Sequence, residues 1–131
     1  MQPALPKQPN LRPQSNIGLL GESLAVSYLQ KKSYIILARN YRGGKGELDI
    51  VAVDDDTLVF IEVKTRSSTY YGSPKEAVTK RKIDEIIRAG HYFSRQHPEV
   101  PKKLRIDVIA ILLSADSHAV RSLEHVINVT G

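Results

Sequence analysis

The sequence predicts an α/β domain in which a central mixed β-sheet is flanked by helices on both faces. Three observations lead to this fold class. An amphipathic helix opens the domain, three runs rich in β-forming residues follow it directly, and a second helical segment separates them from two further runs. The predicted order of elements is therefore αβββαββ, with no internal repeat and no sign of a second domain.

The first helix is predicted from apolar residues that recur three and four positions apart between Ile17 and Leu29. Asn16 precedes them as a candidate N-cap, and the polar residues 31–33 should end the helix. Residues 1–16 hold four of the seven prolines and few apolar side chains. We therefore expect a disordered Pro-rich tail over 1–16 and one folded domain over 17–131.

The next three strands are predicted at residues 34–41, 47–53 and 57–65. The last two runs are apolar on both faces, which is typical of strands in the middle of a sheet that is covered on both sides. Asp55 and Asp56 are expected to form a two-residue hairpin turn between them. That turn fixes which residues of the two strands lie opposite each other.

This register brings charged residues together at one end of the two strands. Asp49 then faces Glu62, and Glu47 faces Lys64. Because side chains alternate between the two faces of a strand, Glu47 and Asp49 should share one side with Val51. The sequence thus predicts two acids and a lysine in one place.

The second helix is predicted to begin at Ser73, where a serine N-cap is followed by proline and, three residues after the cap, by Glu76. It should end near Arg95, before two prolines. Strands at 104–113 and 123–129 complete the predicted sheet.

Composition limits the function further. The 131 residues include no cysteine, which excludes disulfides, thiolate zinc sites and cysteine nucleophiles. No apolar run approaches the roughly 20 residues needed to cross a bilayer, and no secretory signal is visible, so we expect a cytoplasmic protein. The net charge is +5, and residues 75–105 hold nine Lys or Arg against four acids. Such a segment is either a phosphate-binding surface or simply a solvated helix face.

Two carboxylates that oppose each other inside a sheet repel, and ionised groups there are costly unless they are paired or bind a cation. Mg²⁺ or Mn²⁺ would relieve the repulsion at Asp49 and Glu62, and Glu22 of the first helix could add a further carboxylate. Lys64 could then orient the attacking water. The alternative is structural: Asp49 pairs with Lys64 or Arg105, and Glu62 with an arginine.

Several segments resemble the YraN-type family of small bacterial proteins, UPF0102. They are GLLGESLAVSYL, GELDIV, EVKTR, SPKEAVTKRK and RIDVIAI, and the likeness runs from Ile17 to the C-terminus. The family is placed in the restriction endonuclease-like superfamily, so the resemblance implies that fold. It also implies that Asp49, Glu62 and Lys64 match the superfamily's PD-(D/E)xK signature.

By the same resemblance, Glu22 corresponds to the helical acid of archaeal Holliday junction resolvases. Lys82 matches a recurrent helix lysine, and Arg105 and Asp107 match the family's RxDV strand. Junction resolvases of this superfamily act as dimers, which suggests a homodimer. A shared fold does not fix function, so three interpretations stay open. They are a Mg²⁺-dependent endonuclease acting on DNA, including branched or damaged DNA, a nucleic-acid-binding domain without cleavage, and an interaction protein whose acids are structural.

The candidate residues fall into three groups. Catalysis and metal binding are assigned to Asp49, Glu62 and Glu22, with Lys64 as a catalytic cation. Nucleic-acid contacts are assigned to Lys80, Arg81, Lys82, Arg66 and Tyr71. Glu47, Asp107 and Arg105 are expected beside the site, where they would hold its charged groups in position.

Overall fold

The computed structural model describes residues 16–67 and 78–131. Its elements are, in order, α1 (Asn16–Lys31), β1 (Ile35–Gly43), β2 (Gly46–Asp54), β3 (Thr57–Arg66), α2 (Lys80–Gln96), β4 (Lys103–Leu113) and β5 (Val120–Val126). The predicted α/β class and the order αβββαββ are confirmed. The predicted tail lies outside the described residues except for Asn16, which is the first residue of α1.

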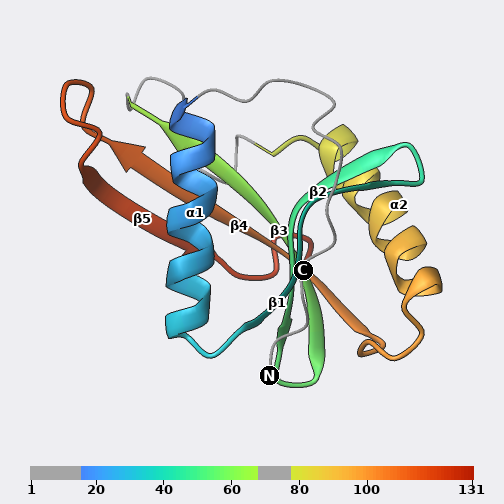
Figure 1. Ribbon diagram of the computed structural model, residues 1–131. Coiled ribbons are helices and arrows are strands. Elements are labelled where there is room, and N and C mark those ends of the chain that lie inside the picture. Colours follow the sequence, from blue (N-terminus) through green and yellow to red (C-terminus); the bar gives the residue numbers. More distant parts are fainter. Residues whose placement is uncertain (1–15, 68–77) are drawn as a thin grey trace.

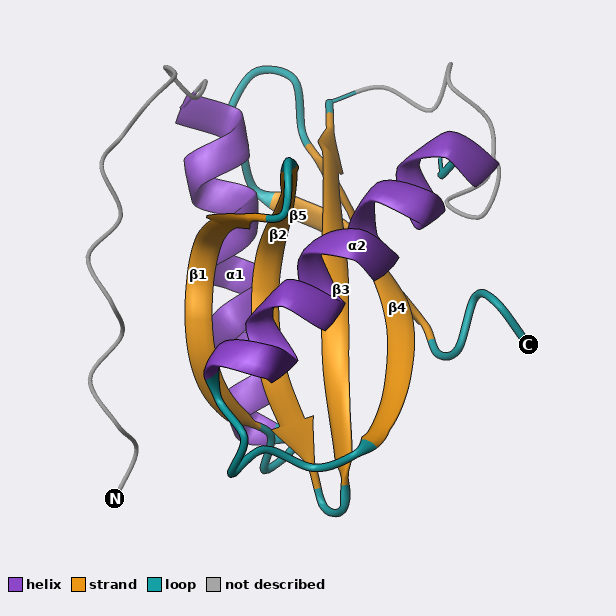
Figure 2. Cartoon of the chain, turned by 90° about the vertical axis from the view of Figure 1, so that its right-hand side faces the viewer, coloured by secondary structure: helices purple, strands orange, loops and turns teal. Residues whose placement is uncertain are grey.

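The five strands form one mixed sheet in the order β1-β2-β3-β4-β5. Neighbouring strands are antiparallel except β3 and β4, which run parallel because the chain crosses over through α2 between them. Helix α1 covers one face of the sheet and α2 covers the other (Figures 1 and 2). Among the described residues, no helix is long and apolar enough to span a membrane.

Strand β3 separates two hydrophobic clusters. Val59 and Ile61 belong to the cluster under α1, whereas Leu58 and Phe60 belong to the cluster under α2. This alternation follows from the two-residue period of a strand, and it explains why β3 is apolar at nearly every position. The central strands therefore hold the two layers of helix together.

Each helix approaches β3 closely at a glycine. A Cβ built on Gly21 of α1 would lie 1.7 Å from Thr65 Oγ1, and one on Gly90 of α2 would lie 2.3 Å from the Phe60 ring. Both distances are far shorter than a van der Waals contact, so any larger residue would force the helix or the facing side chain of β3 to shift.

Helix α2 begins at Lys80, so the predicted start at Ser73 is wrong for this helix. Thr79 is the N-cap, because its backbone is extended and its side chain accepts a hydrogen bond from the Lys82 amide. Ser73 itself lies outside the described residues. Strand β5 also begins and ends three residues earlier than its predicted range.

Strands β2 and β3 pair as predicted from Asp54↔Thr57 to Ile50↔Ile61, and then they separate. Beyond that point β2 continues with β1 as a hairpin that bends over α2, while β3 continues beside β4 as far as Arg66↔Leu112 (Figure 1). We call the place where they part the fork.

The backbone explains the fork. Asn40 of β1, beside the start of the fork, has a φ of 50°, a left-handed conformation that interrupts the alternation of side chains. Ala38 and Tyr41 on either side of it both pack under α2, and in β2 Leu48 and Val51 do the same. The predicted strict alternation through Asp49 is therefore wrong. In both strands, the set of side chains that faces α2 changes from one parity of residue number to the other at this point.

Candidate active site

Asp49 lies at the fork. Its Oδ2 atom accepts a hydrogen bond of 2.8 Å from the backbone amide of Val63 on β3. The side chain of Asp49 thus links β2 to β3 just beyond the last pair of their backbone ladder. This contact holds the carboxylate between the two strands, next to Glu62.

Glu62 is buried, with 4% of its surface exposed, and it is paired with two lysines from different elements. Its Oε2 atom lies 3.4 Å from Lys64 Nζ on the same strand and 3.9 Å from Lys82 Nζ on α2. The ammonium groups compensate the buried charge, and the second one ties the start of α2 to β3. The predicted grouping of Glu62 with Lys64 is therefore present, and Lys82 joins it.

Glu22 reaches the same place from α1. It is buried, and Asn40 Nδ2 donates a hydrogen bond of 3.1 Å to its Oε1 atom. Its charge is close enough to raise the pKa of Asp49. The close contact of Gly21 with Thr65 fixes the position of α1 along the sheet. The left-handed backbone at Asn40 presents the side-chain amide that donates to Glu22. Asn40 was not among the predicted site residues, since in the sequence it is only a turn-forming residue inside a run of β-formers.

The electrostatics of the site are those of two acids held too close together. Burial raises the pKa of Asp49 well above its usual range, and the neighbouring carboxylate of Glu62 raises it further. The hydrogen bond from Val63 opposes this rise, and Glu22 adds to it. Without a cation, Asp49 therefore holds its proton more tightly than an ordinary aspartic acid does.

These residues suit a hard divalent cation in their chemistry. Mg²⁺ is commonly held by one or two carboxylates and keeps several waters. Within residues 16–67 and 78–131, no three His, Asp or Glu side chains stand close enough to form a complete metal cage. The pair Asp49 and Glu62 would thus be the protein ligands, and the remaining positions would belong to water or substrate. The predicted third ligand, Glu22, does not form such a group of three with them in the described part of the chain.

Two of the other predicted nucleic-acid contacts pair with acids of their own helix. Lys80 and Arg81 are on the exposed side of α2, where each makes an ion pair with the acid four residues later. Arg66 ends β3 opposite Leu112. Tyr71 lies outside the described residues. Of the predicted helix cations, Lys82 alone contacts the acid pair through a described ion pair.

Glu47 does not continue the pairing of β2 with β3, so the predicted opposition to Lys64 is wrong. The strands have already parted at Asp49, and Glu47 instead lies opposite Arg42 of β1. Its carboxylate is 3.8 Å from the Arg42 guanidinium. Arg42 is a residue that the sequence analysis did not assign to the site.

Asp107 and Arg105 form a separate buried network. Arg105 donates to Asp107 from Nε at 2.9 Å and from Nη2 at 3.0 Å, and it also donates to Asp54 and to the Tyr34 hydroxyl. Hydrogen bonding to Asp107 raises the pKa of Arg105 well above its usual value. None of these hydrogen bonds reaches Asp49 or Glu62, so the expectation that Asp107 and Arg105 hold the charged groups of the acid pair is wrong for these contacts.

His125 of β5 completes this network. Its Nε2 atom is 2.8 Å from Asp107 Oδ2, and its Nδ1 atom is 3.1 Å from the Tyr28 hydroxyl. Burial alone would raise the pKa of Asp107, but hydrogen bonds from His125, Arg105 and the Asn128 amide outweigh it and lower the pKa. No sequence pattern indicates the role of His125, because its partners lie far away in the chain.

Comparison with known proteins agrees with the resemblance. A family model described as "Uncharacterised protein family UPF0102" matches residues 21–111, a range that includes all the acids and lysines of the site. A UPF0102 protein of Syntrophomonas wolfei is 45% identical over 112 residues, covering 86% of this chain and 95% of the relative. One from Chlorobium phaeobacteroides is 50% identical over 97 residues, covering 74% and 77% of the two chains. One from Alkaliphilus oremlandii is 44% identical over 111 residues, covering 83% and 95%.

Proposed function

The chain belongs to the UPF0102 family, and from the acid pair at the fork of its sheet we propose that it hydrolyses phosphodiester bonds in DNA with Mg²⁺ or Mn²⁺. The observation that carries this proposal is the arrangement of Asp49 and Glu62. Burial and the neighbouring Glu62 carboxylate raise the pKa of Asp49, and two lysines stand within 4 Å of the Glu62 carboxylate. Two buried acids held this close together lower the stability of the fold. A protein that made no use of the site would therefore be more stable without them.

Each residue has a distinct task in this proposal. Asp49 and Glu62 would hold the ion, with Val63 fixing the direction of the Asp49 carboxylate. Lys64 is about a third exposed, so its ammonium can contact both Glu62 and a phosphate. It would orient the attacking water or stabilise the charge that develops on phosphorus. Glu22 makes the site more negative and so strengthens the attraction for a cation.

The bound ion would supply Lewis-acid chemistry: it polarises the phosphodiester and lowers the pKa of a water molecule. The chain's own residues bring these partners together and keep them in place. Because Glu62 is buried and Asp49 is held by a backbone amide, the ligands need little rearrangement before the reaction.

A second candidate function is nucleic-acid binding without cleavage. It is favoured by the ion pairs of Glu62, since Lys64 and Lys82 already compensate that charge without a metal. In this case the lysines would serve phosphate contacts only, and the acids would position them.

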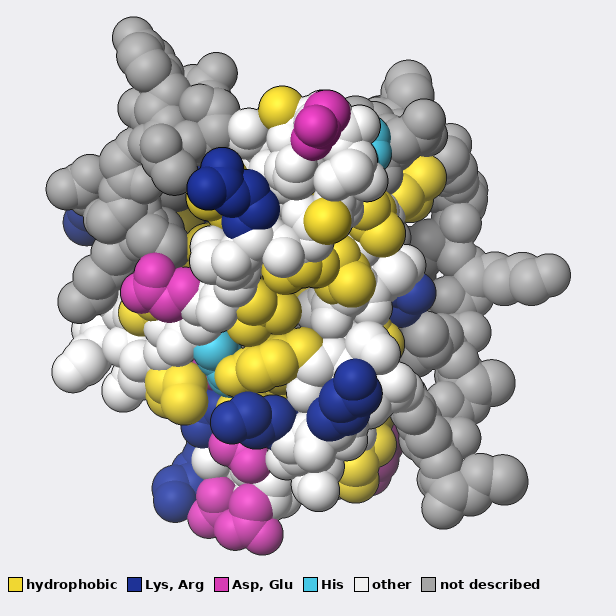
Figure 3. All heavy atoms as spheres, turned by 90° about the vertical axis from the view of Figure 1, so that its left-hand side faces the viewer, with side chains coloured by type: hydrophobic (Ala, Val, Ile, Leu, Met, Phe, Trp, Pro, Cys, Tyr) yellow, Lys and Arg dark blue, Asp and Glu magenta, His cyan; other side chains and the backbone are white. Residues whose placement is uncertain are grey.

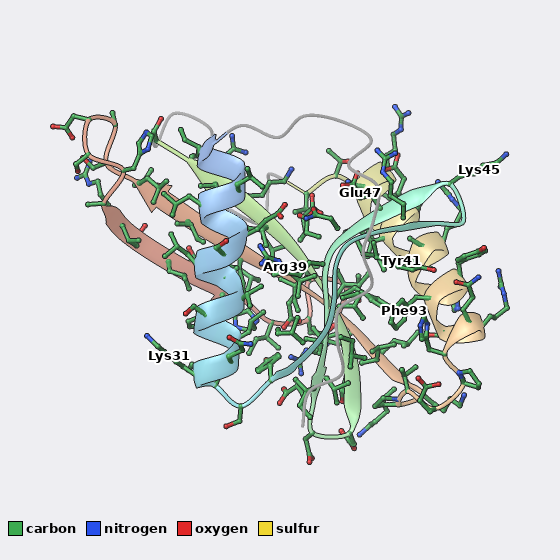
Figure 4. The ribbon with its side chains drawn as sticks, in the orientation of Figure 1. Lys31, Arg39, Tyr41, Lys45, Glu47 and Phe93 are labelled. Carbon is green, nitrogen blue, oxygen red and sulfur yellow. The ribbon has the colours of Figure 1, made fainter. Side chains whose placement is uncertain are left out.

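Cleavage assays distinguish the two candidates. Wild-type protein is incubated with duplex, single-stranded and branched DNA in Mg²⁺, in Mn²⁺ and in EDTA. We expect metal-dependent cleavage that falls at least roughly 100-fold in Asp49→Asn and in Lys64→Met, because each removes a group that acts in the transition state. Lys31→Ala, which removes a cation at the far end of α1, is the matched control (Figure 4).

Cleavage that Asp49→Asn retains in full would show a contaminating nuclease and refute the proposal. Binding that weakens with salt but never leads to cleavage, whatever the metal, would select the second candidate. Asparagine is chosen because its amide oxygen can still accept the hydrogen bond from Val63, so the fold at the fork is preserved.

A further inference from the structure

A groove of about 510 Å³ opens beside the acid pair, between the tip of the β1–β2 hairpin and the first turns of α2. We call it the hairpin groove. Its lining residues are Arg42, Gly43, Lys45, Gly46, Glu47, Lys82 and Glu85. Lys82 belongs to both places, because its ammonium lines the groove and lies 3.9 Å from Glu62 Oε2. A ligand in this groove would therefore extend directly from the site of the acid pair.

The walls of the groove are held in place by close packing. A Cβ built on Gly43 would lie 2.5 Å from the Tyr92 ring, and one on Gly46 would lie 2.7 Å from the Glu85 carbonyl oxygen. Tyr41 also packs edge-on against Phe93, with ring centroids 5.0 Å apart. The hairpin thus rests tightly on α2, and the groove exists before any ligand binds.

The charges of the groove favour an anion. Arg42 and Lys82 are each shared with an acid at long range, 3.8 Å from Glu47 and 4.0 Å from Glu85. In the part of the chain that the structure describes, Lys45 has no ion-pair partner, and it projects from the tip of the hairpin (Figure 4). A phosphate could engage these cations with shorter, better-aligned contacts than the acids provide, and arginine suits it through its two parallel donors.

The size and lining of the groove indicate which form of nucleic acid it takes. Its volume is that of a small-ligand pocket and is too small for a duplex. Among the residues that the structure describes, its lining includes no aromatic side chain on which a base could stack, so the contacts of these residues would be to the backbone and independent of sequence. A single extended strand meets both conditions.

We propose that the hairpin groove binds the sugar-phosphate backbone of an unpaired nucleic-acid strand that continues from the acid pair, with Arg42, Lys45 and Lys82 as its phosphate contacts. This proposal rests on the proposed function, because it takes the acid pair as the place where the same strand is cut. It defines the substrate class as nucleic acid with a single-stranded arm or end. Lys82 would hold the phosphate between the two places.

The test measures binding in EDTA, where no cleavage occurs. A fluorescent oligothymidylate and a blunt duplex of equal length are titrated with protein at several NaCl concentrations, and anisotropy gives the binding constants. The test variant is Arg42→Ala/Lys45→Ala, and Lys31→Ala/Lys32→Ala is a control that removes the same number of charges elsewhere. Thermal unfolding of each variant checks that it is folded.

For the single strand, we expect the negative slope of log K against log [NaCl] to become less steep by roughly 1.4 in the test variant. The value corresponds to two lost phosphate contacts at about 0.7 each. The control variant should keep the wild-type slope with the single strand. With the duplex, the test variant should behave like the control.

The outcomes separate this proposal from the proposed function. If the test variant binds the single strand like wild type while the protein does cut DNA, the groove proposal is refuted and the proposed function stands. An equal loss of affinity for the single strand and the duplex also refutes the groove proposal alone. The expected change in slope without cleavage under any metal supports the groove and refutes the nuclease. If wild type binds neither probe, both proposals are refuted.

Discussion

At the scale of the residue, Asp49 is the group whose environment conflicts most with its charge. It lies between two strands, beside Glu62 and near Glu22, and its pKa is raised well above the usual value of 3.8. A raised pKa means that the folded state binds the proton more tightly than the unfolded state does. The stabilisation by that proton is complete below the unfolded pKa and is lost as the pH rises through the folded pKa.

We therefore predict that Asp49→Asn is more stable than wild type near neutral pH in EDTA, by roughly 1 kcal/mol. The amide keeps the bond to Val63 and removes the repulsion. The advantage should shrink as the pH falls towards 3.8, because wild-type Asp49 is then protonated in both states. Thermal unfolding between pH 3.5 and pH 8 measures the difference, and a variant that is less stable throughout this range would contradict the explanation.

Asp107 shows the opposite behaviour. Its pKa is lowered, because Arg105, His125 and the Asn128 amide together outweigh the effect of burial. A lowered pKa stabilises the folded state above the unfolded value of 3.8 and ceases to do so as the pH falls through the folded value. A buried aspartate thus stabilises the folded state at Asp107 and destabilises it at Asp49, depending on which groups face the carboxylate.

We predict that Asp107→Asn lowers the free energy of unfolding by about 3 kcal/mol at pH 7, because it leaves the buried side of Arg105 without its main partner. Urea unfolding at pH 7 and below pH 4 tests this, with a smaller difference expected in acid. Asp56→Asn is the control, since its ion pair with Lys103 is exposed and should contribute little. Equal effects of the two substitutions would refute the role given to burial.

At the scale of the element, the position of α1 depends on Gly21. This residue lets the helix approach β3 until Thr65 fills the space of a missing Cβ, and that approach brings Glu22 to the fork. The contact explains how two elements far apart in the sequence supply one site.

Gly21→Ala should cost about 1–3 kcal/mol of stability, because the added methyl would lie 1.7 Å from Thr65 Oγ1. A second substitution, Thr65→Gly, removes the obstructing side chain and should recover part of the loss. A double-mutant cycle by urea unfolding measures this coupling. If the two losses simply add, the close contact is not what fixes α1.

Strand boundaries and register were largely predictable at this scale. The pairs from Asp54↔Thr57 to Ile50↔Ile61 follow from a two-residue turn between apolar runs. The start of α2 was not, because the serine, proline and glutamate from Ser73 onwards predicted an earlier cap, whereas the helix is capped by Thr79. The bend at Asn40 was not predictable either, since its left-handed backbone depends on the packing of α1 and β2 around it.

At the scale of the whole molecule, the charged side chains are distributed unevenly over the surface. On the side that carries α1 and β5, apolar side chains gather in the middle while Lys and Arg are scattered singly around them (Figure 3). Among the described residues on that side, the Lys and Arg side chains therefore form no continuous basic patch. The hairpin groove, lined by three cations and two acids, is where we expect an anion to concentrate.

A metal ion that binds the folded chain must also stabilise it as a whole. We predict that Mg²⁺ raises the midpoint of thermal unfolding of the wild type, with a stabilisation of about 2.7 kcal/mol at 100 times the dissociation constant. Asp49→Asn should not respond, because one of the two ligands has lost its charge. Differential scanning calorimetry at a series of Mg²⁺ concentrations measures this, and an equal response of both proteins would place the ion elsewhere.

The sequence by itself determined the class of the fold, the order of its elements and the pairing of β2 with β3, because these depend on local periodicity and turn chemistry. It also marked Asp49, Glu62 and Lys64, since two acids and a lysine in apolar strands are costly to bury. Only the tertiary structure decided that β2 and β3 part at Asp49, that Lys82 reaches Glu62, and that Asp107 belongs to a separate network. Those outcomes depend on contacts between elements distant in the chain, and such contacts leave no periodic signal in the sequence.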